Sequence, residues 1–193
     1  LLANAPGYIG TYLGLTGDRM DAGDAIFTGF ADHFIMINKW DELKSQLCAA
    51  GDITAIAPQT PPAARLAKWQ SCLDPVFAQD SLHAIYRSIP GDPAASVSHA
   101  KKLMDRNSPL AMACAVPLIQ AARDIPTIET ALEHEYRFTH RAVQHSDFIE
   151  GIRAAIIDRD RHPKWQHATF DAVTQADITK MTAPLGADAL TLT

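Results

Sequence analysis

The strongest candidates for chemistry lie in a charged run near the end of the chain, where Arg159 and Lys164 supply cations and Phe148 an aromatic ring. Guanidinium and ammonium groups bind phosphate, and an aromatic ring packs on flat or apolar ligand groups. Together these side chains suit a ligand that carries phosphate as well as a flat or apolar group. Two alternatives stay open: the charges of Arg153 and residues 158–161 pair within a turn that closes a helix, and Phe148 is buried in the core.

Nearby carboxylates have a structural explanation. Asp147 and Glu150 fall in the first turn of a helix that Ser146 is expected to cap, where the helix dipole favours negative charge. Gly151 lowers helix propensity, so we expect a close packing contact there. The sequence thus assigns these carboxylates no catalytic role.

Metal and nucleophile chemistry find little support. The chain has eight histidines, but His134, His140 and His145 miss the three- or four-residue spacing that places two ligands on one helix face. Phosphate-loop, calcium-loop and nucleophile-elbow motifs are also missing from the sequence. The sequence predicts no metal site and no catalytic residue in this chain.

Composition narrows the class of protein. The 193 residues are 47% hydrophobic, with 17 Lys and Arg against 22 Asp and Glu. This mildly acidic balance argues against a nucleic-acid partner, and no apolar run has the length of a membrane span. The three cysteines, Cys48, Cys72 and Cys114, are widely spaced and read as packing groups, which predicts a reducing, cytoplasmic location.

The elements that must position the charged run are almost all helical. Residues 33–37 read as the only convincing strand, and a single strand must find its partner outside this chain or lie as an isolated extended segment. Pro58, Pro61 and Pro62 mark residues 51–63 as a linker. Helices are predicted at residues 7–15, 21–29, 39–49, 64–78, 80–88, 94–106, 108–123, 127–144, 146–158 and 175–183.

Two stretches carry a family resemblance. Residues 145–165, HSDFIEGIRAAIIDRDRHPKW, and residues 6–35, PGYIGTYLGLTGDRMDAGDAIFTGFADHFI, resemble segments of the 3-hydroxyisobutyryl-CoA hydrolase branch of the crotonase (enoyl-CoA hydratase/isomerase) superfamily. The resemblance implies a mainly α fold, the helical C-terminal region of a crotonase. Residues 1–50 would end its core, with the short strand near 33–37 left over from a missing sheet, and residues 64–193 would form a lid and oligomerisation region.

The resemblance also implies an activity, the hydrolysis of a short β-hydroxyacyl-CoA thioester as in valine breakdown. The family's catalytic positions would fall before Leu1, so we expect the chain to be inactive without an upstream half. Arg159, Lys164 and Phe148 would face coenzyme A, here part of the substrate, and homo-oligomers are expected. The alternatives are an enoyl-CoA hydratase/isomerase and a non-catalytic helical module that binds CoA or mediates oligomerisation.

Overall fold

The structure is a computed structural model that describes residues 1–57 and 59–191. Short 3₁₀ turns are η1 (Leu2–Asn4), η2 (Ile37–Lys39), η3 (Ile53–Ala55), η5 (Phe170–Ala172) and η6 (Gly186–Asp188), and η4 (Arg153–Ile157) is a π-helical turn. The α-helices of this part of the chain are α1 (Ile9–Thr16), α2 (Ala22–Phe27), α3 (Trp40–Ala50), α4 (Arg65–Phe77), α5 (Leu82–Ser88), α6 (Ala95–Met104), α7 (Pro109–Asp124), α8 (Ile128–His145), α9 (Phe148–Ile152) and α10 (Gln175–Thr182).

The helix starts follow side-chain caps that can be read from the sequence. Asp21 accepts a hydrogen bond from the Asp24 N–H at 2.8 Å, and Ser108 Oγ accepts one from the Ala111 N–H at 3.1 Å. Pro109 then occupies the first position of α7, where a missing N–H costs nothing. These caps confirm the predicted starts of α2 and α7.

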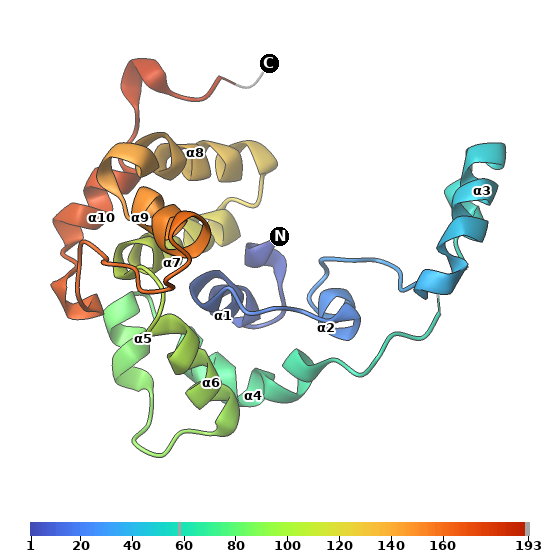
Figure 1. The fold of residues 1–193 in the computed structure, drawn as a ribbon, viewed down its shortest axis with the longest axis horizontal. Coiled ribbons are helices and arrows are strands. Elements are labelled where there is room, and N and C mark those ends of the chain that lie inside the picture. The colour runs from blue at the N-terminus through green and yellow to red at the C-terminus, as the bar shows by residue number, and fades with distance from the viewer. Residues whose placement is uncertain (58, 192–193) are drawn as a thin grey trace.

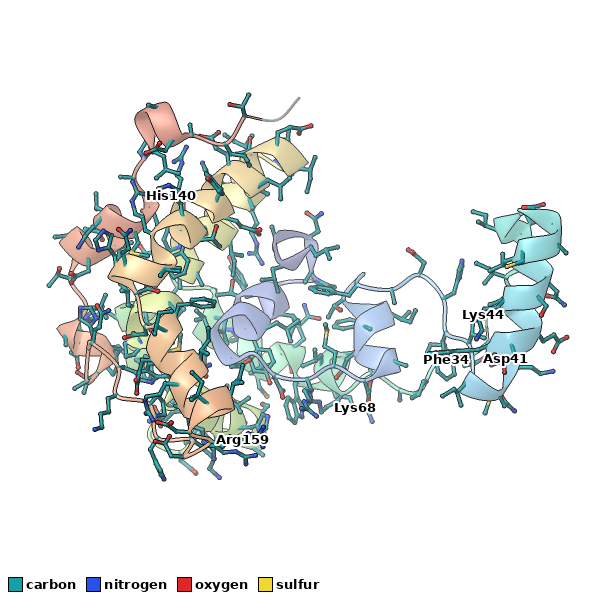
Figure 2. All side chains as sticks on the ribbon, turned by 45° about the horizontal axis from the view of Figure 1, so that its top comes forward. Phe34, Asp41, Lys44, Lys68, His140 and Arg159 are labelled. Atoms are coloured by element: carbon teal, nitrogen blue, oxygen red, sulfur yellow. The ribbon has the colours of Figure 1, made fainter. Side chains whose placement is uncertain are left out.

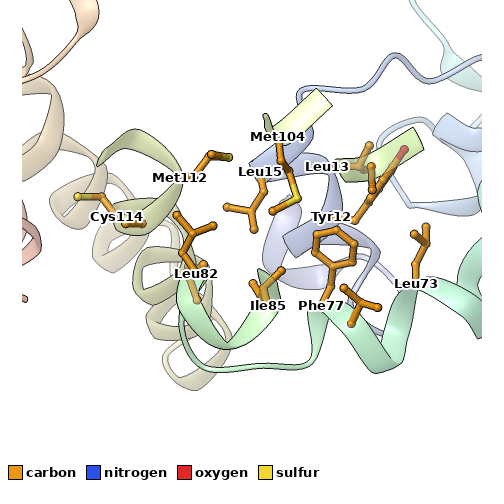
Figure 3. Close-up of a cluster of buried hydrophobic side chains, with 14 of the residues drawn as sticks. Tyr12, Leu13, Leu15, Leu73, Phe77, Leu82, Ile85, Met104, Met112 and Cys114 are labelled. Atoms are coloured by element: carbon orange, nitrogen blue, oxygen red, sulfur yellow. The ribbon is translucent and has the colours of Figure 1, made fainter. Parts of the chain in front are cut away.

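Helix α7 lies at the centre of the helical body, where it packs against α1, α8 and α10. Its apolar residues are buried almost all round, as its sequence predicts. Figure 3 shows the cluster that joins it to α1, α4 and α5, with the rings of Tyr12 and Phe77 edge to face at 5.4 Å. None of the helices in the described residues has the length and apolar character needed to cross a membrane.

Helix α3 stands apart from this body on two extended segments (Figure 1). It packs mainly against its neighbours η2 and η3. The strand predicted at residues 33–37 is not formed; instead, this segment is extended and carries an isolated β-bridge from Phe34 to Gln59. We call residues 31–61 the arm. Several of its apolar side chains are exposed, among them Ile37, Trp40 and Ile53.

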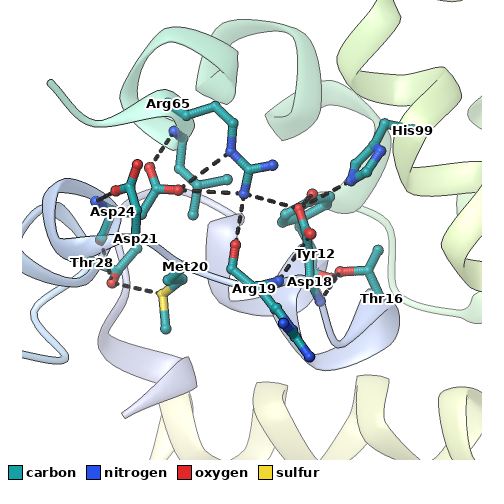
Figure 4. Close-up of polar contacts among 11 residues, drawn as sticks. Tyr12, Thr16, Asp18, Arg19, Met20, Asp21, Asp24, Thr28, Arg65 and His99 are labelled. Carbon is teal, nitrogen blue, oxygen red and sulfur yellow. Dashed lines mark hydrogen bonds and ion pairs between the residues drawn. The ribbon is translucent and has the colours of Figure 1, made fainter.

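Helix α2 is held by a buried carboxylate rather than by an apolar stripe. The sequence predicts that Ala25, Ile26 and Phe30 form a buried stripe on this helix. These side chains are only half-buried, whereas Asp24 is 0% exposed. Asp24 accepts a 2.7 Å hydrogen bond from the Leu66 N–H and lies 3.4 Å from Arg65 Nη2 (Figure 4). The stripe prediction was wrong because a paired charge takes the buried position.

Arg65 joins this contact to a second one. Its Nη2 atom lies 3.0 Å from Asp18 Oδ2, and the Tyr12 hydroxyl donates a hydrogen bond to the same carboxylate. Burial, reinforced by the bond to Asp18, raises the pKa of Tyr12 far above its usual value. The network therefore ties the end of α1 and the start of α2 to the first turn of α4.

Candidate functional site

The charged run after α9 is organised around one side chain, Arg153. Its Nε and Nη2 atoms bind both carboxylate oxygens of Glu150, at 2.9 and 2.8 Å. Its Nη1 atom binds Asp158 at 2.6 Å and Asp160 at 2.7 Å, and Nη2 also reaches the His162 carbonyl at 3.2 Å. The guanidinium fork thus fastens the turn of residues 158–162 onto α9.

The turn itself has an unusual backbone. Arg159 and Arg161 both have positive φ, at 57° and 56°, in the left-handed region that glycine prefers. The Arg161 N–H donates to the Ala154 carbonyl at 3.1 Å, and Arg159 Nε donates to the Ile156 carbonyl at 3.2 Å. The turn follows the π-helical η4, a type of distortion that often accompanies functional sites.

An apolar pocket of about 300 Å³ lies beside this turn. At its edge, the buried Asp147 accepts hydrogen bonds from Ser108 Oγ at 2.5 Å and from the Gln166 N–H at 2.7 Å. The carboxylate thereby joins the starts of α7 and α9 to the segment after the turn. The pocket is lined by Ser108, Ala111, Phe138, Ser146, Asp147, Phe148, Gly151, Ile152, Ile156 and Trp165.

The three residues singled out from the sequence lie around this pocket and turn. Phe148 is 53% exposed and lines the pocket, so the alternative of a buried core side chain is wrong. Arg159 and Lys164 are exposed, and Figure 2 places Arg159 on the helical body, away from Phe34 in the arm. The ion-paired turn is confirmed for Arg153, but Arg159 and Lys164 form no ion pair within residues 1–57 and 59–191.

Two further predictions from the sequence need correction, one at α9 and one for the cysteines. Ser146 was expected to cap the helix, yet Asp147 is the N-cap residue of α9, and Ser146 Oγ accepts only a 3.2 Å bond from the Phe148 N–H. Cys48 and Cys72 are exposed rather than packed, unlike Cys114. No group of three or more possible metal ligands comes together in the part of the chain that the structure describes.

The sequence did not single out two residues that organise the site. Arg153 was assigned only to the ion-paired turn, and the local signals for its central position were the alternating charges of the run and its spacing of three from Glu150, which suits a helical ion pair. Trp165 covers Gly151, whose added Cβ would lie 3.6 Å from the indole ring, and its Nε1 atom donates to the Arg106 carbonyl at 3.1 Å. The packing contact expected at Gly151 is therefore present.

Acid should open this turn at an unusually low pH. The Arg153 bond and then the Lys164 N–H lower the pKa of Glu150 from its usual 4.5 to about 2. A depressed carboxyl pKa contributes stability above the unfolded value, and this contribution is lost as pH falls toward 2. We expect Trp165 fluorescence, in a Trp40→Phe, Trp69→Phe background, to change near that pH. A transition centred near pH 4.5 would contradict the expectation, and Glu150→Gln should abolish it.

Comparison with known proteins agrees with the helical fold. Residues 1–182 match the family described as Enoyl-CoA hydratase/isomerase. The chain is 25% identical to the mitochondrial 3-hydroxyisobutyryl-CoA hydrolase of Rattus norvegicus, over 96% of this chain and 51% of the relative. It is 27% identical to probable 3-hydroxyisobutyryl-CoA hydrolase 2 of Arabidopsis thaliana, over 92% of this chain and 51% of the relative. The chain spans about half the length of the curated relatives it matches.

Solved structures are similar over nearly the whole chain. An enoyl-CoA hydratase from Rhodobacter sphaeroides is 43% identical with a TM-score of 0.93, covering 99% of this chain and 56% of its own. A carnitinyl-CoA dehydratase from Mycobacterium thermoresistibile is 33% identical with a TM-score of 0.87, covering 95% of this chain and 54% of its own. The helices described above therefore have the arrangement of the helical C-terminal region of the crotonase fold, and the chain belongs to the enoyl-CoA hydratase/isomerase family.

Proposed function

We propose that this chain is the C-terminal part of an acyl-CoA thioester hydrolase of the 3-hydroxyisobutyryl-CoA type, acting in valine catabolism. The observation that carries the proposal is the family match over residues 1–182, together with curated relatives that are named hydrolases. Those relatives are about twice as long as this chain. The catalytic carboxylates and oxyanion-hole donors would come from the other half of such a protein.

The geometry around α9 supports a role in holding the substrate. CoA combines phosphate groups with an apolar arm and an adenine ring, and the site offers exposed cations next to an apolar pocket. Arg159 bonds the carbonyl of Ile156, a residue that lines the pocket, and Lys164 adjoins the lining residue Trp165. In this proposal Arg159 and Lys164 bind the CoA phosphates, and Phe148 packs on the adenine or pantetheine.

The arm supports the idea that the chain works with a second half. Ile37 and Ile53 are 78% and 77% exposed, and the arm that carries them has few contacts with the helical body. The Rhodobacter structure keeps this arrangement over 99% of the present chain and continues well beyond it. We propose that a catalytic half covers the arm, and that the chain alone is inactive.

A hydratase or isomerase of the same family is the second candidate. The solved structures, titled enoyl-CoA hydratase and carnitinyl-CoA dehydratase, are more similar in sequence, at 43% and 33%, than the two hydrolases described above. A non-catalytic CoA-binding or oligomerisation module is the third. Homo-oligomers and a cytoplasmic location belong to the proposal, although the rat relative is named mitochondrial.

Reconstitution tests the proposal. The chain should be mixed with the part of the Rhodobacter protein that lies outside the matched region, and assayed for CoA release from 3-hydroxyisobutyryl-CoA and for hydration of crotonyl-CoA. We expect CoA release only when both parts are present. Ile53→Asp in the arm should prevent assembly, whereas Val143→Asp, at a position 60% exposed on α8, should not.

The other outcomes separate the candidates. Hydration without thioester cleavage would favour the hydratase. Assembly without either activity would favour the non-catalytic module. CoA release by the chain alone would overturn the proposal that the catalytic groups lie in the other half.

A further inference from the structure

The turn after η4 keeps two arginines in a conformation that arginine seldom adopts. At Arg159 and Arg161, φ is 57° and 56°, and a Cβ-bearing residue is strained there. Two such residues with a single residue between them persist only when neighbouring contacts hold them in place. The structure provides those contacts through Arg153, which binds Asp158 and Asp160 immediately before each of the two arginines.

The same contacts separate the cations into two groups. Residues 150–164 hold three carboxylates, Glu150, Asp158 and Asp160, and all three bind Arg153. The remaining cations of this segment are exposed, and in the described chain none of them pairs with a carboxylate: Arg159, Arg161 and Lys164. Arg153 thus pairs with the carboxylates of this segment, and the unpaired cations are exposed to solvent.

We infer that Arg153 is the positioning residue of an anion-binding turn: its bonds to Glu150, Asp158 and Asp160 fix the backbone that presents Arg159 and Arg161 to the phosphate groups of CoA. The identity of the ligand rests on the proposed function. Arg161 joins Arg159 and Lys164 as a binding residue. Arg153 itself does not touch the ligand, because all its donors that face the turn are engaged within it.

Substitutions at Arg153 test this role. Arg153→Met and Arg153→Lys should each weaken CoA binding about tenfold in titration calorimetry, since charge-assisted hydrogen bonds hold the turn and lysine lacks the planar fork. A residue that only supplied positive charge would be replaced without loss by lysine. Arg137→Met is the matched control, because Arg137 forms a 2.5 Å pair with Glu133 on α8, and we expect it to leave CoA affinity unchanged.

Amide hydrogen exchange gives a readout independent of CoA. The N–H groups of Arg161 and Lys164, which bond Ala154 and Glu150, should exchange faster in Arg153→Met. Adding Arg161→Gly to Arg153→Met should slow the exchange at Lys164 again, because glycine adopts positive φ without strain. Exchange that Arg153→Met leaves unchanged would overturn the positioning role.

CoA titration distinguishes this inference from the proposed function. If Arg153→Met and Arg153→Lys bind CoA as tightly as the wild-type protein does, the inference is overturned, and the proposed CoA contact still stands. Wild-type protein that binds no CoA would overturn both. Weaker binding in both Arg153 variants, with Arg137→Met unaffected, would support both.

Discussion

Replacing Asp24 with alanine should lower the free energy of unfolding by about 3 kcal/mol. The side chain is 0% exposed, and the substitution leaves the Leu66 N–H without its acceptor and Arg65 without one of its two carboxylates. Asp24→Asn should cost less, about 1 kcal/mol, because an amide oxygen can still accept from Leu66. Urea unfolding followed by circular dichroism at neutral pH measures both values.

Asp41 provides the matched control for this substitution. It also forms an ion pair, with Lys44 at 2.7 Å, but its side chain is 97% exposed on α3 (Figure 2). Asp41→Ala should therefore change the free energy of unfolding by less than about 0.5 kcal/mol. Equal losses at Asp24 and Asp41 would contradict the view that burial, rather than pairing alone, decides the effect.

The buried Asp24 also shows what the sequence could not predict. Hydrophobic periodicity places apolar residues on the inner face of α2, and no local rule puts a carboxylate there. Its partners Arg65 and Leu66 follow the arm in sequence, so their approach to Asp24 depends on the tertiary fold. The burial of the Asp24 charge is tolerable because these two residues pair with it.

Features that depend on neighbouring residues were predicted well. The bounds of α4, α7 and α8 fall within two residues of the predicted ranges, because apolar periodicity is a local signal, as are the N-caps Ser108 of α7 and Thr127 of α8. The strand predicted at residues 33–37 is not formed, and the alternative of an isolated extended segment is confirmed. A run rich in β-formers becomes a strand only when another strand pairs with it, and among the described residues Phe34 has a single bridge, to Gln59.

The candidate site was predicted in part for the same reason. Residue types pointed to the cations and the aromatic ring around α9. Which cation is free and which is paired depends on how the chain folds back after η4. Arg153 takes the carboxylates and Arg159 takes none in the described chain, although both lie in the same alternating run of charges.

Asp147→Ala should be the second most damaging change, with a loss of about 2 kcal/mol in the free energy of unfolding. Asp147 is 4% exposed and accepts hydrogen bonds from Ser108 Oγ and the Gln166 N–H, so alanine leaves both donors without an acceptor. The missing carboxylate also enlarges the apolar pocket and frees the segment that holds Trp165. We therefore expect CoA binding to weaken together with stability.

A double-mutant cycle with Ser108 separates the two roles of that serine. Ser108→Ala alone removes both the cap of α7 and the bond to Asp147, whereas in the Asp147→Ala background only the cap remains to be lost. The two single losses should therefore exceed the double loss by about 1 kcal/mol. Additive losses would mean that Asp147 does not act through Ser108. The pocket would then depend on the hydrogen bond between Asp147 and the Gln166 N–H. Asp188→Ala, at an exposed carboxylate in η6, is the control for the loss of a charge alone.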